Sequence, residues 1–334
     1  MINLETTYMG LQLKNPLIVS SSGLTNSVRK IKIIEEKGAG AVVLKSLFEE
    51  QIRNETKNLI SKDPSNSSYP EAEDYIQTYI KGNSVSTYLN LIKEAKEAVS
   101  IPVIASINCV SSSDWTSFAK EIEKAGADAI ELNVFIVPGD RNMSSTEYEK
   151  LYYNIFNAVK KEVTIPISMK IGIYFTNLFF VANRLNADGA DALVLFNRFY
   201  EPDIDIEKMK ITSAEVLSSA SDIRKSLRWV GMLSDKIKGL DISASTGIHN
   251  GEAAIKQLLA GAVTVQVCST VYEHGFDQIT TILEDISKWM VRKEFKTVGE
   301  FRGSLNYGSI QDPGLYERAQ FMKYFSNNEK DALI

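Results

Sequence analysis

The sequence predicts an α/β fold in which parallel strands and helices alternate, and three observations support this prediction. A pattern of amphipathic helix, turn and short apolar run recurs four times, at residues 34–46, 122–134, 185–197 and 258–270. The apolar runs lack the alternation of half-exposed strands, as expected for parallel strands covered on both faces. Four further apolar runs alternate with these repeats, at residues 16–23, 101–108, 165–172 and 240–247. The total is eight strand-then-helix units, the number found in a TIM (β/α)8 barrel.

A doubly wound open sheet would also alternate strands and helices. The barrel is favoured because the sequence has no sharp domain boundary, no Pro/Ser-rich linker and no glycine-rich dinucleotide turn after the first strand. The 334 residues, 44% of them hydrophobic, are enough for one large core. We therefore expect a single barrel domain over residues 1–310 and a C-terminal extension over residues 311–334.

Three segments lie outside the repeat. The first residues, "NLETTYMGLQLKN", alternate around a turn and are expected to form a β-hairpin that closes the lower end of the barrel. A long polar insert, residues 49–86, follows the second strand, and another, residues 198–226, follows the sixth. Long loops at the strand ends of a rigid scaffold are usually lids or binding loops.

Composition excludes several classes of function. A net charge of −5 argues against nucleic acid as the main partner, because phosphate binding requires a basic face. The two cysteines, Cys109 and Cys268, lie in apolar runs and form no disulfide framework, which favours a reducing cytoplasm. No apolar run approaches the length of a membrane span, the N-terminus does not resemble a signal peptide, and two histidines leave little for a metal site.

Polar residues gather where the predicted strands end, which is where barrels of this kind place their active sites. The first six strands end in Ser20, Ser21, Ser22 and Gly23, in Lys45 and Ser46, in Asn108, in Glu131 and Asn133, in Lys170, and in Asn197. Two lysines at strand ends imply an anion between them. Alternatively, each extends to solvent or pairs with a carboxylate such as Glu131.

The last two strands end in "ASTG" and "CST", which supply Ser245, Thr246, Gly247, Ser269 and Thr270. Glycine and hydroxyl groups beside a helix N-terminus bind phosphate well, and barrels often place that site after strands seven and eight. The alternative is an ordinary turn in which Asn250 caps the next helix, and His249 is interpreted as a loop residue. A phosphate site with two lysines and several amides suggests a mononucleotide such as a flavin, whose reduced ring a nearby cation stabilises.

These segments together resemble a known family. "NPLIVSSSG", "VVLKS", "AIELN", "SMKIG", "LVLFN", "STGIHNGEAAIKQLLAGAVTVQVCST" and "VGEFRGSL" follow, in order, the pattern of the class 1 dihydroorotate dehydrogenases over residues 3–305. "LKSLFEEQI", "YPEAEDY", "IPVIASIN", "LVLFNRFYEPDID" and "DPGLYERAQFMK" resemble the branch called dihydroorotate dehydrogenase-like proteins. The resemblance implies a cytosolic, homodimeric, FMN-dependent TIM barrel that oxidises dihydroorotate to orotate in pyrimidine biosynthesis.

The resemblance also implies residue roles. The flavin ring would lie against Ser20, Ser21, Ser22 and Gly23, with Lys170 near its N1 and O2 atoms. Lys45 and Ser46 would contact the flavin, Lys45 on the substrate side. The phosphate would be held by Ser245, Thr246, Gly247, Ser269 and Thr270. The substrate would be bound by Lys45, Asn133, Asn197 and Arg198, although Arg198 stands where the family has a small residue, which favours a different anion.

The loop after "ELN" departs from the family pattern. Relatives carry a cysteine or serine just before a proline, and this base removes the C5 proton while hydride leaves C6. Here the loop reads "VFIVP", with Ile136 near the base position, and neither it nor Val137 can accept a proton. General bases contribute ~10²–10⁴-fold to rates, so dihydroorotate oxidation should be slow unless another group serves. The candidates are Cys109, Tyr200 and Tyr69.

The leading interpretation is an FMN-dependent oxidoreductase that transfers hydride between FMN and a small, carboxylate-bearing substrate. One alternative is an FMN-binding protein with little catalysis, which acts as a sensor or scaffold. The other is a flavin-free aldolase with a phosphate site, in which Lys45 or Lys170 forms a Schiff base.

Overall fold

The computed structural model describes residues 2–48, 70–108, 115–198 and 201–317. Eight parallel strands form a barrel, which closes because β4 pairs with both β3 and β6. The TIM barrel predicted from the sequence is therefore confirmed. Its strands are β3 (Leu17–Val19), β4 (Ala41–Val43), β6 (Val103–Asn108), β7 (Ala129–Val134), β8 (Ile167–Ile171), β9 (Ala192–Leu195), β12 (Asp241–Ser245) and β13 (Thr264–Val267). A short strand, β5 (Leu47–Phe48), pairs with the end of β6.

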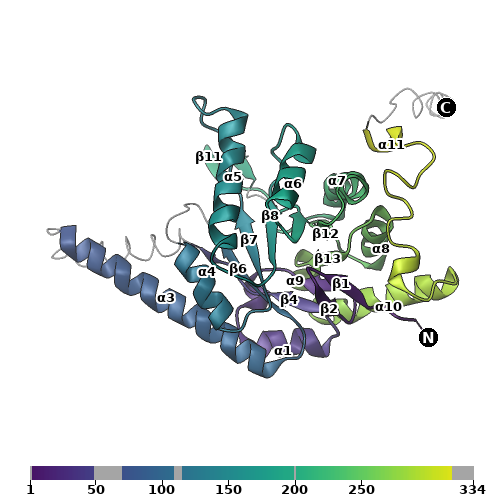
Figure 1. Ribbon diagram of the computed structural model, residues 1–334, viewed down its shortest axis with the longest axis horizontal. Helices are drawn as coiled ribbons and strands as arrows, with labels where there is room; N and C mark the ends of the chain where they lie inside the picture. Colours follow the sequence, from purple (N-terminus) through teal and green to yellow (C-terminus); the bar gives the residue numbers. More distant parts are fainter. Residues whose placement is uncertain (1, 49–69, 109–114, 199–200, 318–334) are drawn as a thin grey trace.

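Helices surround the barrel and bury its outer face (Figure 1). Every residue of β4, β7 and β8 is buried, because one side chain faces the interior and the next faces the helices. The main core therefore lies between strands and helices, with fully buried side chains such as Val42, Ile92 and Phe156. The helices that follow strands are α1 (Val28–Glu36), α3 (Pro70–Ala98), α4 (Trp115–Lys124), α5 (Ser145–Lys160), α6 (Leu178–Ala187), α7 (Ile223–Lys236), α8 (Gly251–Ala260), α9 (Ser269–His274) and α10 (Asp277–Arg292).

The N-terminal hairpin closes the lower end of the barrel, as the sequence predicts. Its strands β1 (Thr6–Tyr8) and β2 (Leu11–Leu13) are joined by a tight turn in which Met9 and Gly10 both have positive φ. Tyr8 and Leu13 are buried in a second apolar cluster together with interior residues of the barrel strands. The backbone N–H of Met9 donates to a carboxylate oxygen of Asp241, at the start of β12, over 2.8 Å.

The first long insert differs from the sequence-based expectation. Residues 49–69 lie outside the described residues, but α3 begins at Pro70, so the stretch up to residue 86 is helix and not loop. Proline suits the first position of a helix, where its missing N–H is not needed. The helix extends well beyond the barrel (Figure 1). The sequence did not indicate this, because a helix that leaves the core needs no apolar periodicity.

The second insert forms a hairpin that projects from the barrel. Its strands β10 (Pro202–Asp205) and β11 (Lys210–Ser213) pair with each other alone, and nearly all of their residues are exposed. A 3₁₀ turn, Ala220–Asp222, then leads into α7, which begins at Ile223, three residues earlier than the insert was expected to end.

The chain ends its described part at a short helix, α11 (Gly314–Glu317), which contacts α7. The Tyr316 hydroxyl donates to the carbonyl of Leu305 over 2.5 Å. The domain boundary near residue 310 stays a prediction. Within the described ranges, no helix has both the length and the apolar character needed to cross a membrane.

Tyr8 tests the role of the hairpin in stability. It is 0% exposed, so Tyr8→Ala should lower the free energy of unfolding by about 3–5 kcal/mol. Tyr8→Phe should cost about 1 kcal/mol or less, because it keeps the buried ring and removes only the hydroxyl group. Urea denaturation gives both values. The control is Val291→Ala, because Val291 is 63% exposed. If Tyr8→Ala and Val291→Ala lowered the free energy of unfolding equally, the hairpin would not contribute to the stability of the core.

Candidate active site

A cavity of about 210 Å³ opens at the carboxyl ends of the barrel strands. Among the predicted ring-side and substrate-side residues, its walls include Ser20, Ser21, Lys170, Asn197 and Arg198. The cavity lies where this fold places its active sites, because the loops that follow parallel strands converge at that end.

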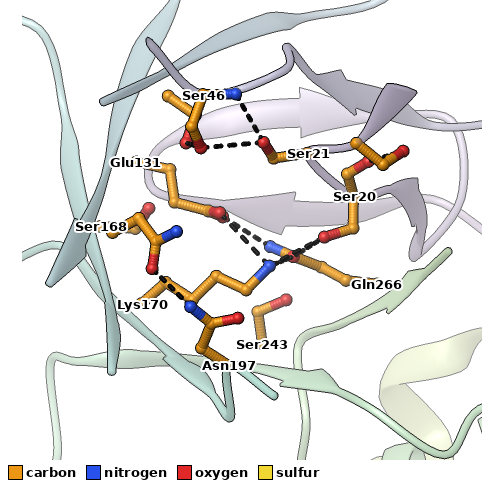
Figure 2. Close-up of polar contacts among 12 residues, drawn as sticks. Ser20, Ser21, Ser46, Glu131, Ser168, Lys170, Asn197, Ser243 and Gln266 are labelled. Carbon is orange, nitrogen blue, oxygen red and sulfur yellow. Dashed lines mark hydrogen bonds and ion pairs between the residues drawn. The ribbon is translucent and has the colours of Figure 1, made fainter. Parts of the chain in front are cut away.

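Lys170 is the buried cation of the cavity. It is interior on β8, only 6% exposed, and its ammonium donates to Ser20 Oγ over 2.8 Å and to Gln266 Oε1 over 3.3 Å. Glu131 Oε1, from the neighbouring strand β7, lies 3.6 Å from the same nitrogen. Figure 2 shows these side chains converging from several strands inside the barrel. The ion pair matches the alternative in which each lysine pairs with a carboxylate, and Lys170 nevertheless lines the cavity.

Glu131 and Gln266 are joined by a hydrogen bond beside Lys170. Glu131 is 1% exposed, and its Oε2 accepts from Gln266 Nε2 over 2.8 Å. Its Oε1 accepts no hydrogen bond within the described residues and faces the ammonium of Lys170. Removing two charges from water costs several kcal/mol, which only a close and well-bonded pair offsets. Glu131 therefore holds the Lys170 side chain in the barrel interior.

Hydroxyl groups continue the polar interior toward β4 and β6. Ser46 Oγ lies 2.9 Å from Ser21 Oγ and 2.7 Å from Ser106 Oγ, and its backbone N–H donates to Ser21. Ser168 and Ser243, both 0% exposed, occupy interior positions of β8 and β12 (Figure 2). Barrel interiors are usually filled by bulky branched residues. Small polar residues here keep the upper part of the barrel open and hydrophilic.

Lys45 does not share this cavity. It is half-buried and lines a separate groove of about 750 Å³ between α1 and α3, together with Ser46 and Tyr88. Ser21 lines the first cavity and Ser46 lines the second, and the hydrogen bonds between them lie where the two meet. The two lysines therefore line different pockets, which the hydrogen-bonded pair of Ser21 and Ser46 connects.

The predicted phosphate cradle lies on the other side of the first cavity, at the ends of β12 and β13. Ser245, Thr246, Gly247 and Ser269 all line it. Thr246 and Gly247 both have positive φ, and a Cβ on Gly247 would lie 2.1 Å from the backbone nitrogen of Ile223. Only glycine fits at this close approach. Hydroxyl and backbone N–H donors beside a glycine suit a phosphate group.

Other predicted phosphate or ring residues do not line the cavity. Thr270 is 0% exposed and its hydroxyl donates to the carbonyl of His249 over 2.8 Å. Ser22 instead caps the 3₁₀ turn that begins at Gly23, where its side chain accepts from the N–H of Leu24.

The two predicted substrate amides meet. Asn197 Nδ2 donates to Asn133 Oδ1 over 2.8 Å. The two amides therefore form a hydrogen-bonded pair at the ends of β7 and β9. Arg198 follows, and its guanidinium donates to the carbonyl of Glu215 over 2.6 Å and lies 3.7 Å from a carboxylate oxygen of Glu201. The projecting hairpin region therefore positions Arg198 on the cavity wall.

No base is found at the expected loop position. Ile136 packs its side chain against the main core, and its N–H donates to Tyr152 Oη over 3.2 Å. Burial raises the pKa of Tyr152, so its hydroxyl stays protonated at neutral pH. Burial also raises the pKa of Cys268, which lines the cavity, although a hydrogen bond with Ser22 opposes the shift. The candidates Cys109, Tyr200 and Tyr69 lie outside the described residues.

Sequence reasoning missed Gln266, Cys268 and Ser218, which all line the cavity. The sequence did contain a signal for Gln266, because it is a polar amide within the apolar run "VTVQV", just as Glu131 is an acid within "AIELN". Ser218 had none, since it lies in the second long insert. In the part of the chain that the structure describes, no three His, Cys, Asp or Glu residues are grouped to hold a metal ion.

Comparison with known proteins gives matches over most of the chain. A family model described as dihydroorotate dehydrogenase matches residues 3–290. The catalytic subunit of dihydroorotate dehydrogenase B (NAD(+)) from Methanocaldococcus jannaschii is 27% identical over 313 residues, which cover 90% of this chain and 97% of that protein. The protein of the same name from Methanocella arvoryzae is 30% identical over 297 residues, 86% of this chain and 93% of its own length.

Glu131 tests the buried network. Glu131→Ala leaves the Lys170 ammonium buried without its counter-charge, so unfolding should become easier by about 3–5 kcal/mol in urea denaturation. The double variant Glu131→Leu with Lys170→Met should recover most of that loss, because it removes both charges.

Glu121→Ala is the matched control for Glu131→Ala. Glu121 pairs with Lys124 at side chains that are 48% and 62% exposed, and such a pair is worth about 0–1 kcal/mol. A loss for Glu131→Ala no larger than for this control would show that the buried ion pair does not support the fold.

Proposed function

The chain belongs to the dihydroorotate dehydrogenase family, and from that premise we propose that it is an FMN-dependent oxidoreductase acting on a CH–CH group of a small, carboxylate-bearing substrate. One observation carries the proposal. A buried ammonium, Lys170, and a cradle formed by Gly247 and Ser269 line the same cavity at the strand ends.

The residues of this cavity fit FMN by their chemistry. Ser269 offers a hydroxyl donor to a phosphate, and beside it glycine is sterically required at position 247. Ser20, Ser21 and Lys170 offer hydroxyl and ammonium donors suited to the polar edge of a flavin ring. When bound, FMN supplies the acceptor of a hydride, and a cation beside the ring stabilises its reduced, anionic form. The Lys170 ammonium is the residue proposed for this task.

The substrate is proposed to bind through amides and one guanidinium. The Asn133–Asn197 pair offers donors and acceptors at the mouth of the barrel, and Arg198 offers a forked donor that suits a carboxylate. A role for Lys45 in binding substrate rests on the family resemblance alone, because it lines the neighbouring groove.

Dihydroorotate itself is proposed to be a poor substrate. Ile136 and Val137 cannot accept the C5 proton, and the raised pKa values of Tyr152 and Cys268 keep both groups protonated. This observation also favours a second candidate function, an FMN-binding protein with little catalysis. Of the two lysines in the flavin-free aldolase alternative, Lys170 is the less suited to a Schiff base, since its side-chain nitrogen is hydrogen-bonded to Ser20 and Gln266.

We also propose that the chain pairs with a second copy through the projecting hairpin. Ile204, Ile206, Met209 and Ile211 are 61–88% exposed on this hairpin, and exposed apolar clusters usually mark interfaces. A two-stranded hairpin is only marginally stable in water by itself, so burial against a partner would stabilise it. A cytoplasmic location stays a prediction from the use of cysteine.

Anaerobic titration tests the proposed activity. The purified protein should show the visible absorption of oxidised flavin, and dihydroorotate should bleach it slowly. Ile136→Cys or Val137→Cys should restore a base and speed bleaching by ~10²–10⁴-fold, with Ile136→Ala as the control. A colourless protein that takes up no FMN would refute the proposal. Rapid bleaching of the unaltered protein would show that another group serves as the base.

Light scattering after gel filtration tests the proposed dimer. The unaltered chain should elute with twice its mass of 37.2 kDa. Ile204→Asp with Ile211→Asp should give monomers, because both residues face the same side of the hairpin as directly paired neighbours. Val291→Asp, at another exposed apolar residue, should leave the dimer intact. A dimer that survives the hairpin changes would place the interface elsewhere.

A further inference from the structure

A histidine and a glutamate lie directly behind the phosphate cradle. His249 Nε2 is 3.1 Å from Ser218 Oγ, and His249 Nδ1 is 3.2 Å from Glu273 Oε2. The three residues come from the second insert, the loop after β12 and helix α9. The sequence analysis interpreted His249 as a loop residue, and nothing in the local sequence joins it to the other two.

Ser218 links this histidine to the cavity. It lines the cavity, is 7% exposed, and both its N–H and its hydroxyl donate to Ser269 Oγ over 3.0 Å. The N–H of Gly247 in turn donates to Ser218 Oγ over 3.4 Å. A hydroxyl group has one hydrogen. Because Ser269 Oγ already accepts twice, its own hydrogen is left to be donated to a ligand in the cavity.

A count of hydrogens gives the direction of the hydrogen bond between His249 and Ser218. Ser218 gives its only hydroxyl hydrogen to Ser269, so toward the imidazole its oxygen can only accept, and Nε2 must carry a hydrogen. Glu273 Oε2 lies 3.2 Å from Nδ1, on the other side of the ring.

The backbone holds this histidine in place. Its carbonyl accepts from Thr270 Oγ1 and from Gln278 Nε2, each over 2.8 Å. The side chain is 13% exposed, whereas His274, the other histidine of the chain, is 57% exposed and lies 3.8 Å from the same Glu273 oxygen. Thr270, predicted to bind phosphate, therefore contributes through the position of His249.

We propose that His249, paired with Glu273, is a positioning residue of the phosphate cradle, a role that rests on the FMN binding proposed above. By donating to Ser218 Oγ, the His249 Nε2–H leaves the Ser218 hydroxyl hydrogen for Ser269, and the hydroxyl hydrogen of Ser269 is then left for the phosphate oxygens. A hydroxyl, histidine and carboxylate can also activate a nucleophile. Here the Ser218 hydrogen is directed to Ser269 and not to the histidine, so Ser218 orients the Ser269 hydroxyl and is not an activated nucleophile.

FMN and riboflavin distinguish this role from a structural one, because they share the ring and differ in the phosphate. Apoprotein is titrated with each ligand, and binding is followed by quenching of flavin fluorescence. His249→Ala should weaken FMN binding by about tenfold to a hundredfold, the usual effect of losing a hydrogen bond to a charged group, and should leave riboflavin binding unchanged. His274→Ala is the matched control and should change neither.

A double-mutant cycle tests the route of the effect. Ser218→Ala should weaken FMN binding, and adding His249→Ala to it should cost much less than in the unaltered protein, because the histidine acts through Ser218. His249→Gln, which keeps a side-chain N–H of similar reach, should recover part of the affinity. Circular dichroism of each variant excludes loss of the fold as the cause.

Three results would overturn the proposal. They are unchanged FMN binding by His249→Ala in a folded protein, an equal loss for riboflavin, and an equal loss in His274→Ala. Failure of the unaltered protein to bind either flavin would instead refute the proposed function. In that case, calorimetry with inorganic phosphate still decides the inference, since binding should be weaker in folded His249→Ala than in the unaltered protein, and equal binding would overturn it.

Discussion

The ion pair between Glu131 and Lys170 is the interaction on which the upper half of this barrel depends. Two opposite charges are enclosed by eight strands, and neither can turn toward bulk water. Each must therefore be satisfied inside, by the 3.6 Å contact between them and by hydrogen bonds to Gln266 and Ser20. These partners come from strands β7, β8 and β13 and from Ser20, just after β3, so the network also constrains the register of strands that are distant in sequence.

The barrel interior is divided along its axis. At the lower end, Tyr8 and Leu13 of the N-terminal hairpin fill the space with apolar side chains and exclude water. Toward the upper end, serines replace the branched residues usual in such barrels, and the interior opens into a cavity. The lower cluster stabilises the barrel through apolar packing. The upper half has less apolar packing and instead carries polar groups that a ligand can contact. This division explains why one small scaffold can carry both stability and a polar site.

The site combines features that the family resemblance implies with features that depart from it. Lys170, Asn197 and Gly247 line one cavity at the strand ends, and Asn197 is hydrogen-bonded to Asn133. The loop "VFIVP" offers no proton acceptor, and Lys45 lines a neighbouring groove. Charge stabilisation and proton removal are separable contributions to hydride transfer, and this chain is equipped for the first. The network of Ser218, His249 and Glu273 is proposed to strengthen the binding of an anion, and this role does not require the base that the loop lacks.

The sequence alone determined the barrel, the closing hairpin, and the strand ends that carry Lys170, Asn133, Asn197 and Gly247. Local patterns suffice for these, because buried parallel strands read as apolar runs and their carboxyl ends converge by topology. Only the tertiary structure decided that Lys45 and Lys170 occupy different spaces, and that Ser218, His249 and Glu273 meet across separations of 31 and 24 residues. The physical reason is that side-chain direction and long-range contact depend on how distant segments pack, and no local pattern in a single chain records that packing.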